Sequence, residues 1–365
     1  MDRTSKKSNP VISIQNIYYM LSYAFHILNK QGYKKIATEE FHNVAELCAA
    51  ILATGVSSLI KRGLGREYME QTETLSTLRG KIDISESIKK QTFLRKQLIC
   101  SYDEFSVNSY MNRIIKTTTN LLLKSDISKT RKKQLRKLMV FFVDVDLLDI
   151  TEINWRINYN RNNQTYRMLI SICYLVVKGL LQTTSEGSVK LMNFLDEQRM
   201  SRLFEKFVLE FYRREYPQIS VNASQIPWSV DDGVRYMLPI MQSDVTLKFE
   251  DKILIIDTKF YARTTQKRYN TQTLHSANLY QMFAYVKNWA SQKSRPSNLV
   301  SGLILYEKPD DDTHLDESYV FSGNEISVKT INLNIDFNEI AGQLNDIVNN
   351  QFDLDMTPRY LSKLN

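Results

Sequence analysis

The chain has 365 residues, of which 43% are hydrophobic and 24% charged, a composition typical of a globular protein with enough apolar residues for two domains. No run of about eighteen uncharged apolar residues occurs, which argues against a membrane span. The three cysteines lie too far apart for a zinc or disulfide motif, which favours a reducing compartment, so we expect a cytoplasmic protein. The net charge of +8 is compatible with a polyanionic partner.

The first part of the chain is predicted to be mostly helical. Apolar residues recur at helical spacing from Ile14 to Phe25 and from Val44 to Ile60. The next segment, GLGREYMEQTETLSTLRGKIDISESIKK, alternates irregularly and predicts short strands or an extended arm near residues 60–95. Helices are expected again at 109–123 and 130–142, and the basic run SKTRKKQLRK there is better explained as a solvated helix face than as a phosphate-contacting patch.

The second part changes its pattern. An apolar helix is expected at 161–181 and a long helix, ended by Pro217, at 196–217. The segments that follow predict strand, strand, helix, strand and strand at 237–249, 252–261, 276–290, 299–306 and 327–334. We therefore predict an α+β or α/β protein, in which a helix-rich domain (residues 1–155) precedes a domain (residues 156–365) with a central mixed sheet flanked by helices.

The stretch MQSDVTLKFEDKILIIDTKFY places charges directly after a buried strand. Asp257 and Lys259 are two residues apart, so their side chains leave the same face of the strand. If the preceding turn is centred between Glu250 and Asp251, Asp244 lies opposite Asp257. Two carboxylates and one lysine then share a patch, as in a metal-dependent phosphodiesterase that holds Mg²⁺ through Asp244 and Asp257.

The alternative is that Asp244 is an ordinary surface residue and that Asp257 and Lys259 mark a solvated strand end. A slip of one residue in the turn would send Asp244 to the opposite face of the sheet. From the spacing of these residues alone, the two interpretations are equally good.

Neighbouring residues favour the metal site. Gln281 and Tyr285 are four residues apart on the helix after the hairpin, and either Glu205 or Glu210 of the helix before it could add a carboxylate. Positive charge follows just beyond the hairpin, where a phosphate backbone would run, at Arg263, Lys267 and Arg268.

Taken together, several segments resemble the McrC family, the nuclease subunits of the McrBC modification-dependent restriction systems. In chain order they are ISIQNIYYMLSYAF, GLGREY, RGKID, NRIIKTT, DVTLKFEDKILIIDTKFY and NLYQMFAYV. The resemblance extends from about Ile12 to the strands near residue 335. It implies a PD-(D/E)xK restriction-endonuclease-like domain, whose catalytic pattern matches Asp244, Asp257 and Lys259, with Gln281 as a further catalytic residue.

The resemblance also implies partners. McrC-like proteins bind McrB, a hexameric AAA+ GTPase ring, stimulate its GTP hydrolysis and cleave double-stranded DNA that carries modified cytosine. Residues 1–155 would then contact the ring, and the arm at 60–95 would be the inserted element. The sequence has no G-x-x-x-x-G-K-[ST] phosphate loop, so we expect the partner and not this chain to bind GTP. The rival hypotheses are a regulatory module that activates a motor ring without cutting, and a stand-alone nuclease.

Overall fold

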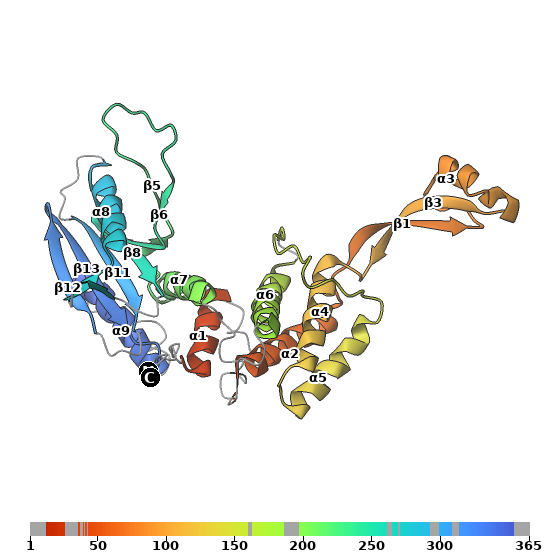
Figure 1. Ribbon diagram of the computed structural model, residues 1–365, viewed down its shortest axis with the longest axis horizontal. Helices are drawn as coiled ribbons and strands as arrows, with labels where there is room; N and C mark the ends of the chain where they lie inside the picture. Colours follow the sequence, from red (N-terminus) through yellow and green to blue (C-terminus); the bar gives the residue numbers. More distant parts are fainter. Residues whose placement is uncertain are drawn as a thin grey trace, which may run out of the picture. The chain divides into compact units, whose positions relative to one another are not determined.

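The computed structural model describes residues 12–25, 36, 39, 41, 43–159, 163–185, 197–260, 265–268, 271–292, 299–308 and 314–353. The chain forms two compact units, one of residues 41–194 and one that combines residues 1–40 with 195–365 (Figure 1). These units differ from the predicted division at residue 155 in two ways. Residues 1–40 group with the C-terminal part of the chain, and the helical unit extends to residue 194. Helix α1 (Ile14–Phe25) packs on α7 (Glu197–Glu215), whereas α6 (Gln164–Ser185) packs on α2 (Val44–Arg62).

The helical unit, residues 41–194, is built around α2. Asn43 caps its first turn by accepting a hydrogen bond from the Glu46 amide, and Gly63 ends it with φ of 86°. By length and composition α2 could cross a membrane, which the sequence analysis did not anticipate. However, 72% of its most apolar window is buried inside the structure, as is usual for a core helix. The helices packed on it are α4 (Tyr110–Lys124), α5 (Lys129–Met139) and α6.

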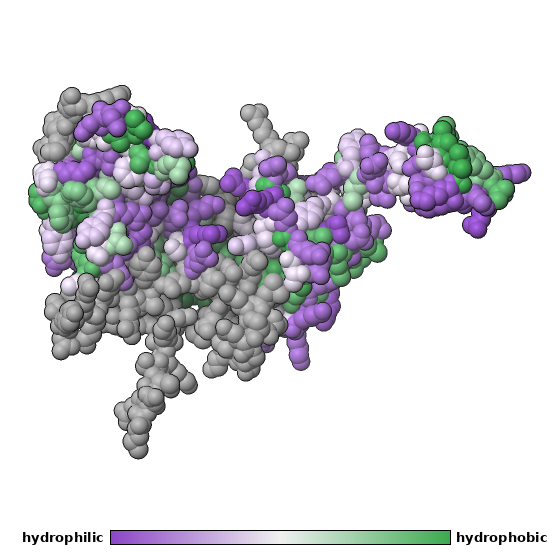
Figure 2. All heavy atoms as spheres, turned by 45° about the horizontal axis from the view of Figure 1, so that its top comes forward, coloured by the Kyte–Doolittle hydropathy of each residue, from purple (hydrophilic) through white to green (hydrophobic). Residues whose placement is uncertain are grey.

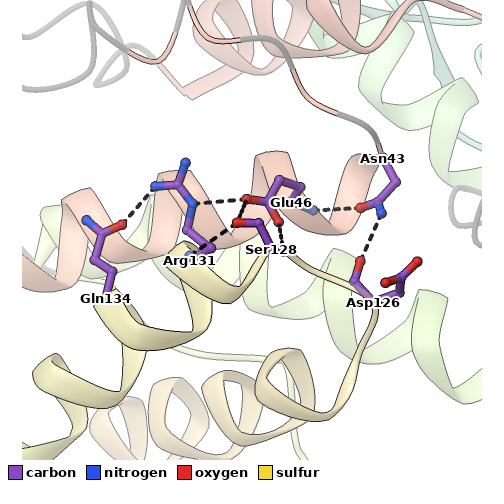
Figure 3. Close-up of polar contacts among 6 residues, drawn as sticks. All are labelled: Asn43, Glu46, Asp126, Ser128, Arg131 and Gln134. Carbon is purple, nitrogen blue, oxygen red and sulfur yellow. Dashed lines mark hydrogen bonds and ion pairs between the residues drawn. The ribbon is translucent and has the colours of Figure 1, made fainter.

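A buried carboxylate fastens α5 to α2 (Figure 3). Glu46 is 7% exposed and accepts hydrogen bonds from the Ser128 amide and hydroxyl, both at 2.8 Å. Its Oε1 also lies 3.4 Å from Nε of Arg131, and Ser128 itself caps α5. Leu135 is the buried apolar residue of α5, while Lys133 and Arg136 are exposed, which fits the predicted solvated basic face.

An arm projects from the helical unit (Figure 1). Strand β1 (Glu67–Leu75) pairs antiparallel with β3 (Leu98–Ser106) along its whole length. Between these strands lie β2 (Lys81–Ile82), the short helix α3 (Ile84–Lys89) and a 3-10 turn at Thr92–Arg95. The predicted arm is therefore present, but its end at residue 95 was wrong, because the returning strand β3 belongs to it.

The second unit contains a mixed sheet. Within the described residues this sheet has six strands in the order β12-β13-β11-β8-β7-β4, and β11 runs parallel to both β8 and β13 while the other neighbours are antiparallel. The strands are β4 (Ser220–Asn222), β7 (Val245–Phe249), β8 (Lys252–Lys259), β11 (Val300–Glu307), β12 (Asp316–Phe321) and β13 (Asn324–Ile331). A mixed sheet flanked by helices is what the sequence predicts, although β4 and β12 were not anticipated.

Smaller elements complete this unit. Two short antiparallel pairs are formed by β5 (Gln225–Ile226) with β6 (Met241–Gln242) and by β9 (Thr265–Arg268) with β10 (Thr271–Leu274). Helix α8 (Ser276–Ala290) has the predicted bounds, and α9 (Phe337–Phe352) was not anticipated.

Helices α7 and α8 both contact the sheet, and α7 also contacts α1 and α9. On α8, Met282 lies over Gly302 of β11, where an added Cβ would come within 2.6 Å of its sulfur. On α7, Phe207 and Phe211 contact Tyr23 of α1, and Phe207 also contacts Phe337 of α9. Both helices are thus held in place by large buried side chains, and each carries polar residues toward the end of β8.

Candidate active site

The β7–β8 hairpin has the predicted register. Val245 pairs with Ile256 and Phe249 pairs with Lys252, so the turn is centred between Glu250 and Asp251. Glu250 adopts φ of 50°, a left-handed conformation that a tight turn requires. Asp244 immediately precedes β7, just beyond the last ladder pair, and lies beside the end of β8.

Alternation along β8 decides where its charged residues point. Ile253 and Ile255 pack in one core cluster with Met282 of α8. Asp257 and Lys259 continue that alternation, so their side chains leave β8 on the side of α8. Asp257 is 2% exposed, and its Oδ2 lies 2.6 Å from Nζ of Lys259.

Asp244 is held against the next residue of β8. Its Oδ2 accepts hydrogen bonds from the amide of Thr258 at 2.7 Å and from the hydroxyl of Thr258 at 2.8 Å. One carboxylate oxygen is thereby fixed in position by two donors. The sequence carries no sign of this role for Thr258, because the contact depends on how the two strand ends approach each other.

A chain of hydrogen bonds connects Lys259 to α8. Its Nζ donates to Oε1 of Gln281 at 3.3 Å, and Nε2 of Gln281 donates to the Tyr285 hydroxyl at 2.8 Å. The Tyr285 hydroxyl donates in turn to the carbonyl of Gln242 at 3.0 Å, two residues before Asp244. The Q-x-x-x-Y spacing thus places both side chains in one network with the lysine.

The sequence left open whether Glu205 or Glu210 joins the site, and in the structure Glu205 is the one near Asp244 and Asp257. Burial and the negative charges of Asp244 and Asp257 raise the pKa of Glu205 to about 7. Glu210 instead forms an ion pair with Arg213, at 2.7 Å. The two glutamates are five positions apart on α7, which puts them on different faces of the helix.

The carboxylates repel one another. Burial and the charge of Asp244 together raise the pKa of Asp257 to about 6, against the lowering effect of Lys259. A single lysine therefore does not offset the negative charge of Glu205, Asp244 and Asp257 when all three are ionised, and a cation would be stabilised here.

The donor set suits a magnesium ion. Mg²⁺ prefers oxygen ligands and is usually held by one or two carboxylates, with water and substrate phosphates completing its shell. In the described part of the chain, no three Asp, Glu, His or Cys side chains lie close enough together to enclose a metal ion by themselves. Asp244 and Asp257 fit the open kind of magnesium site, in which substrate completes the coordination.

The basic residues predicted beyond the hairpin are Arg263, Lys267 and Arg268. Arg263 and the side chains of Lys267 and Arg268 lie outside the described residues. The backbone of residues 265–268 forms β9.

Comparison with known proteins decides the family. Residues 2–301 match the family model described as McrBC 5-methylcytosine restriction system component. The chain belongs to this family. All of the clustered side chains, from Glu205 to Tyr285, fall within the matched range.

Two relatives in the McrBC systems match most of the chain. The Escherichia coli (strain K12) protein named type IV methyl-directed restriction enzyme EcoKMcrBC is 30% identical over 344 residues, which cover 93% of this chain and 97% of that protein. A refined half-complex from a tetradecameric assembly of Thermococcus gammatolerans McrB AAA+ hexamers with bound McrC has a TM-score of 0.50 and 17% identity, with coverage of 92% of this chain and 75% of that chain. At this identity the second match shows a shared fold alone.

This member of the McrBC family has a second candidate site at the end of its arm. Apolar side chains gather there (Figure 2), and Ile84, Ile88 and Leu94 are 60%, 61% and 81% exposed. Leu78 and Phe93 at the same end are also exposed. Contiguous exposed apolar residues with polar surroundings are typical of a protein interaction surface.

Proposed function

We propose that the chain is the metal-dependent DNA endonuclease subunit of a methylcytosine-dependent restriction complex, and that its sheet-containing unit is a nuclease of the PD-(D/E)xK type. The observation that carries the proposal is the arrangement around the end of β8, where Asp257 and Lys259 leave one face beside Asp244. Gln281 of α8 accepts a hydrogen bond from Lys259, and Glu205 of α7 lies near enough to Asp244 and Asp257 for their charges to raise its pKa. Membership of the McrBC family supports it.

In this proposal Asp244 and Asp257 hold Mg²⁺, with Glu205 beside them. The ion would polarise the scissile phosphate and lower the pKa of a bound water. Lys259 places a positive charge next to the reacting phosphate, where negative charge develops during hydrolysis. Gln281 restrains the Lys259 ammonium, and Thr258 fixes the orientation of Asp244. Each of these contacts reduces the reorganisation that the site needs before the chemical step.

The proposed partner is an McrB-like AAA+ ring that hydrolyses GTP. Three findings favour it: the exposed apolar end of the arm, the lack of a phosphate-loop motif in the printed sequence, and the similarity of fold to a McrC bound to McrB hexamers. We propose that the arm binds this ring and stimulates GTP hydrolysis, and that the partner reads the modified cytosine in double-stranded DNA. A cytoplasmic location belongs to the same proposal and agrees with three free, buried cysteines.

A regulatory module that activates the ring without cutting is the second candidate. The intact grouping of Asp244, Asp257 and Lys259 favours the nuclease over this alternative. A stand-alone nuclease is disfavoured by the arm, because an exposed apolar surface such as its end is typical of a protein that binds a partner.

The test is cleavage of a methylated plasmid by the chain together with its partner ring, GTP and Mg²⁺. We expect cleavage that requires all four components, and a loss of at least about 100-fold for Asp257→Asn, with stimulation of GTP hydrolysis retained. Asp316→Asn, which removes an exposed carboxylate paired with Lys329, is the control and should cut normally. Normal cleavage by Asp257→Asn would refute the metal assignment.

A further inference from the structure

The base of the arm is held by one buried side chain. The ladder between β1 and β3 ends at the pair Glu67 and Ser106, so the residues just before and after it have no ladder partner. Nδ2 of Asn112, on α4, donates to the carbonyl of Gly65 at 2.8 Å and to the carbonyl of Val107 at 2.8 Å. Asn112 therefore joins the two chain segments that flank the strands of the arm, and its side chain is fully buried.

A tyrosine from α6 closes the same network. The Tyr166 hydroxyl accepts a hydrogen bond from the amide of Gly65 at 2.7 Å and donates to Oδ1 of Asn112 at 2.7 Å. All the polar atoms of the Asn112 side chain are thereby satisfied, and Tyr166 is 5% exposed. We name Gly65, Asn112 and Tyr166 the arm clamp.

The arm clamp requires a glycine. A Cβ at residue 65 would lie 2.9 Å from the Tyr166 hydroxyl and 3.1 Å from its ring, closer than ordinary contact allows. The backbone of residue 65 can approach the tyrosine only without a side chain. The backbone N–H and C=O of Gly65 both form hydrogen bonds within the clamp, to Tyr166 and Asn112 respectively.

The arm beyond the clamp is stiffened by its own contacts. The Tyr102 hydroxyl donates to Glu73 at 2.9 Å, and the Thr72 and Ser101 hydroxyls lie 3.0 Å apart across the two strands. The Arg79 guanidinium stacks 3.8 Å from the centroid of the Tyr102 ring. A paired ribbon with such contacts bends most easily where its ladder stops, and that is where the clamp lies.

We propose that Asn112 and Tyr166 are positioning residues that set the direction in which the arm leaves the helical unit, and that stimulation of the partner ring depends on this direction. The inference rests on the proposed role of the arm. The end of the arm provides the contacts, and the clamp ensures that those contacts reach the ring in one orientation. Without it, the arm would still bind through its apolar end but would engage in many orientations, most of them unproductive.

The test uses Tyr166→Phe, which removes the hydroxyl and keeps the ring, and Asn112→Ala as a second variant. Tyr212→Phe is the matched control, because it removes another buried hydroxyl, bonded to the carbonyl of Leu344 at 3.0 Å in the other unit. Spin labels on cysteines introduced at the exposed positions Thr74 on the arm and Lys133 on α5 report the arm's direction in the full chain.

We expect the distribution of distances between the labels to broaden in Tyr166→Phe and Asn112→Ala and to stay narrow in the control. The maximal rate of GTP hydrolysis by the ring should fall about threefold to tenfold, the size expected for one or two lost hydrogen bonds. The concentration of chain that gives half of that maximal rate should change less than about twofold, because the exposed apolar residues that bind the ring are unchanged in these variants.

The outcomes separate the two proposals. Broadened distances with an unchanged maximal rate would overturn the role of the clamp in stimulation and leave the proposed function standing. Unbroadened distances would overturn the clamp itself. If the variants show broadened distances but even the wild-type chain stimulates no ring, the proposed function of the arm is overturned. The proposed dependence of stimulation on the arm's direction is then overturned with it.

Discussion

At the scale of single residues, the choice between Glu205 and Glu210 can be tested directly. We predict that Glu205→Gln lowers the rate of DNA cleavage by about tenfold to 100-fold, since a carboxylate beside the two metal ligands is lost. Glu210→Gln is a matched control on the same helix. It loses an ion pair with Arg213 and should lower the free energy of unfolding, with the cleavage rate per folded molecule unchanged. Equal losses of cleavage in both variants would show that neither glutamate is specific to the site.

The same carboxylates predict a pH dependence of stability. The pKa values of Glu205 and Asp257 are raised to about 7 and about 6, so the folded state binds more protons than the unfolded one. Their stabilising contribution is complete below their unfolded pKa values, about 4, and is lost as the pH rises through about 6 to 7. In chelator, the free energy of unfolding should therefore fall more steeply between about pH 5 and pH 7.5 for the wild type than for Glu205→Gln.

Denaturation in urea at several pH values measures this difference. Mg²⁺ added at the higher pH should restore stability to the wild type, because a ligand that binds the folded state stabilises it. Identical pH dependence in the two proteins would contradict the assignment of Glu205 to the carboxylate group.

At the scale of secondary-structure elements, the end of the arm is the segment to perturb. Ile88→Asp and Leu94→Asp place charge on residues that are 61% and 81% exposed, so the fold should be unaffected. We predict that each raises about tenfold the concentration of chain needed to stimulate the ring, the loss typical of a central interface residue. Val143→Asp, at a position 75% exposed outside the arm, is the control. A similar loss in the control would mean that the arm is not the binding element.

At the scale of the whole molecule, the two units predict a separation of activities. A fragment of residues 41–194 keeps α2, α4, α5, α6 and the arm together. It should stimulate GTP hydrolysis by the partner ring and cleave no DNA, because Asp244, Asp257 and Lys259 belong to the other unit. A fragment ending at residue 155 would lack α6, including Tyr166, and is predicted to fold poorly.

Turnover of GTP with and without the 41–194 fragment is the measurement, with circular dichroism to show that the fragment is folded. Stimulation by a protein that lacks residues 41–194, with none by the folded fragment, would reverse the roles assigned to the units.

The sequence by itself determined the features that depend on local geometry. The β7–β8 hairpin register follows from a turn at Glu250 and Asp251, and that register brings Asp244 to the end of β8. The helix at 276–290 and the four-residue spacing of Gln281 and Tyr285 follow from helical periodicity. These predictions need only neighbours a few positions away in the chain.

The tertiary structure decided what depends on distant segments. Both Glu205 and Glu210 lie on a regular helix, and only the packing of α7 decides which of them faces the carboxylates. Residues 1–40 belong with residues 195–365 because Tyr23 packs among aromatic side chains of α7, a contact that no local pattern encodes. The arm extends to Ser106 because β3 pairs with β1 across more than twenty intervening residues. Side-chain packing and strand pairing over long separations are properties of the folded chain, and so the sequence alone left them open.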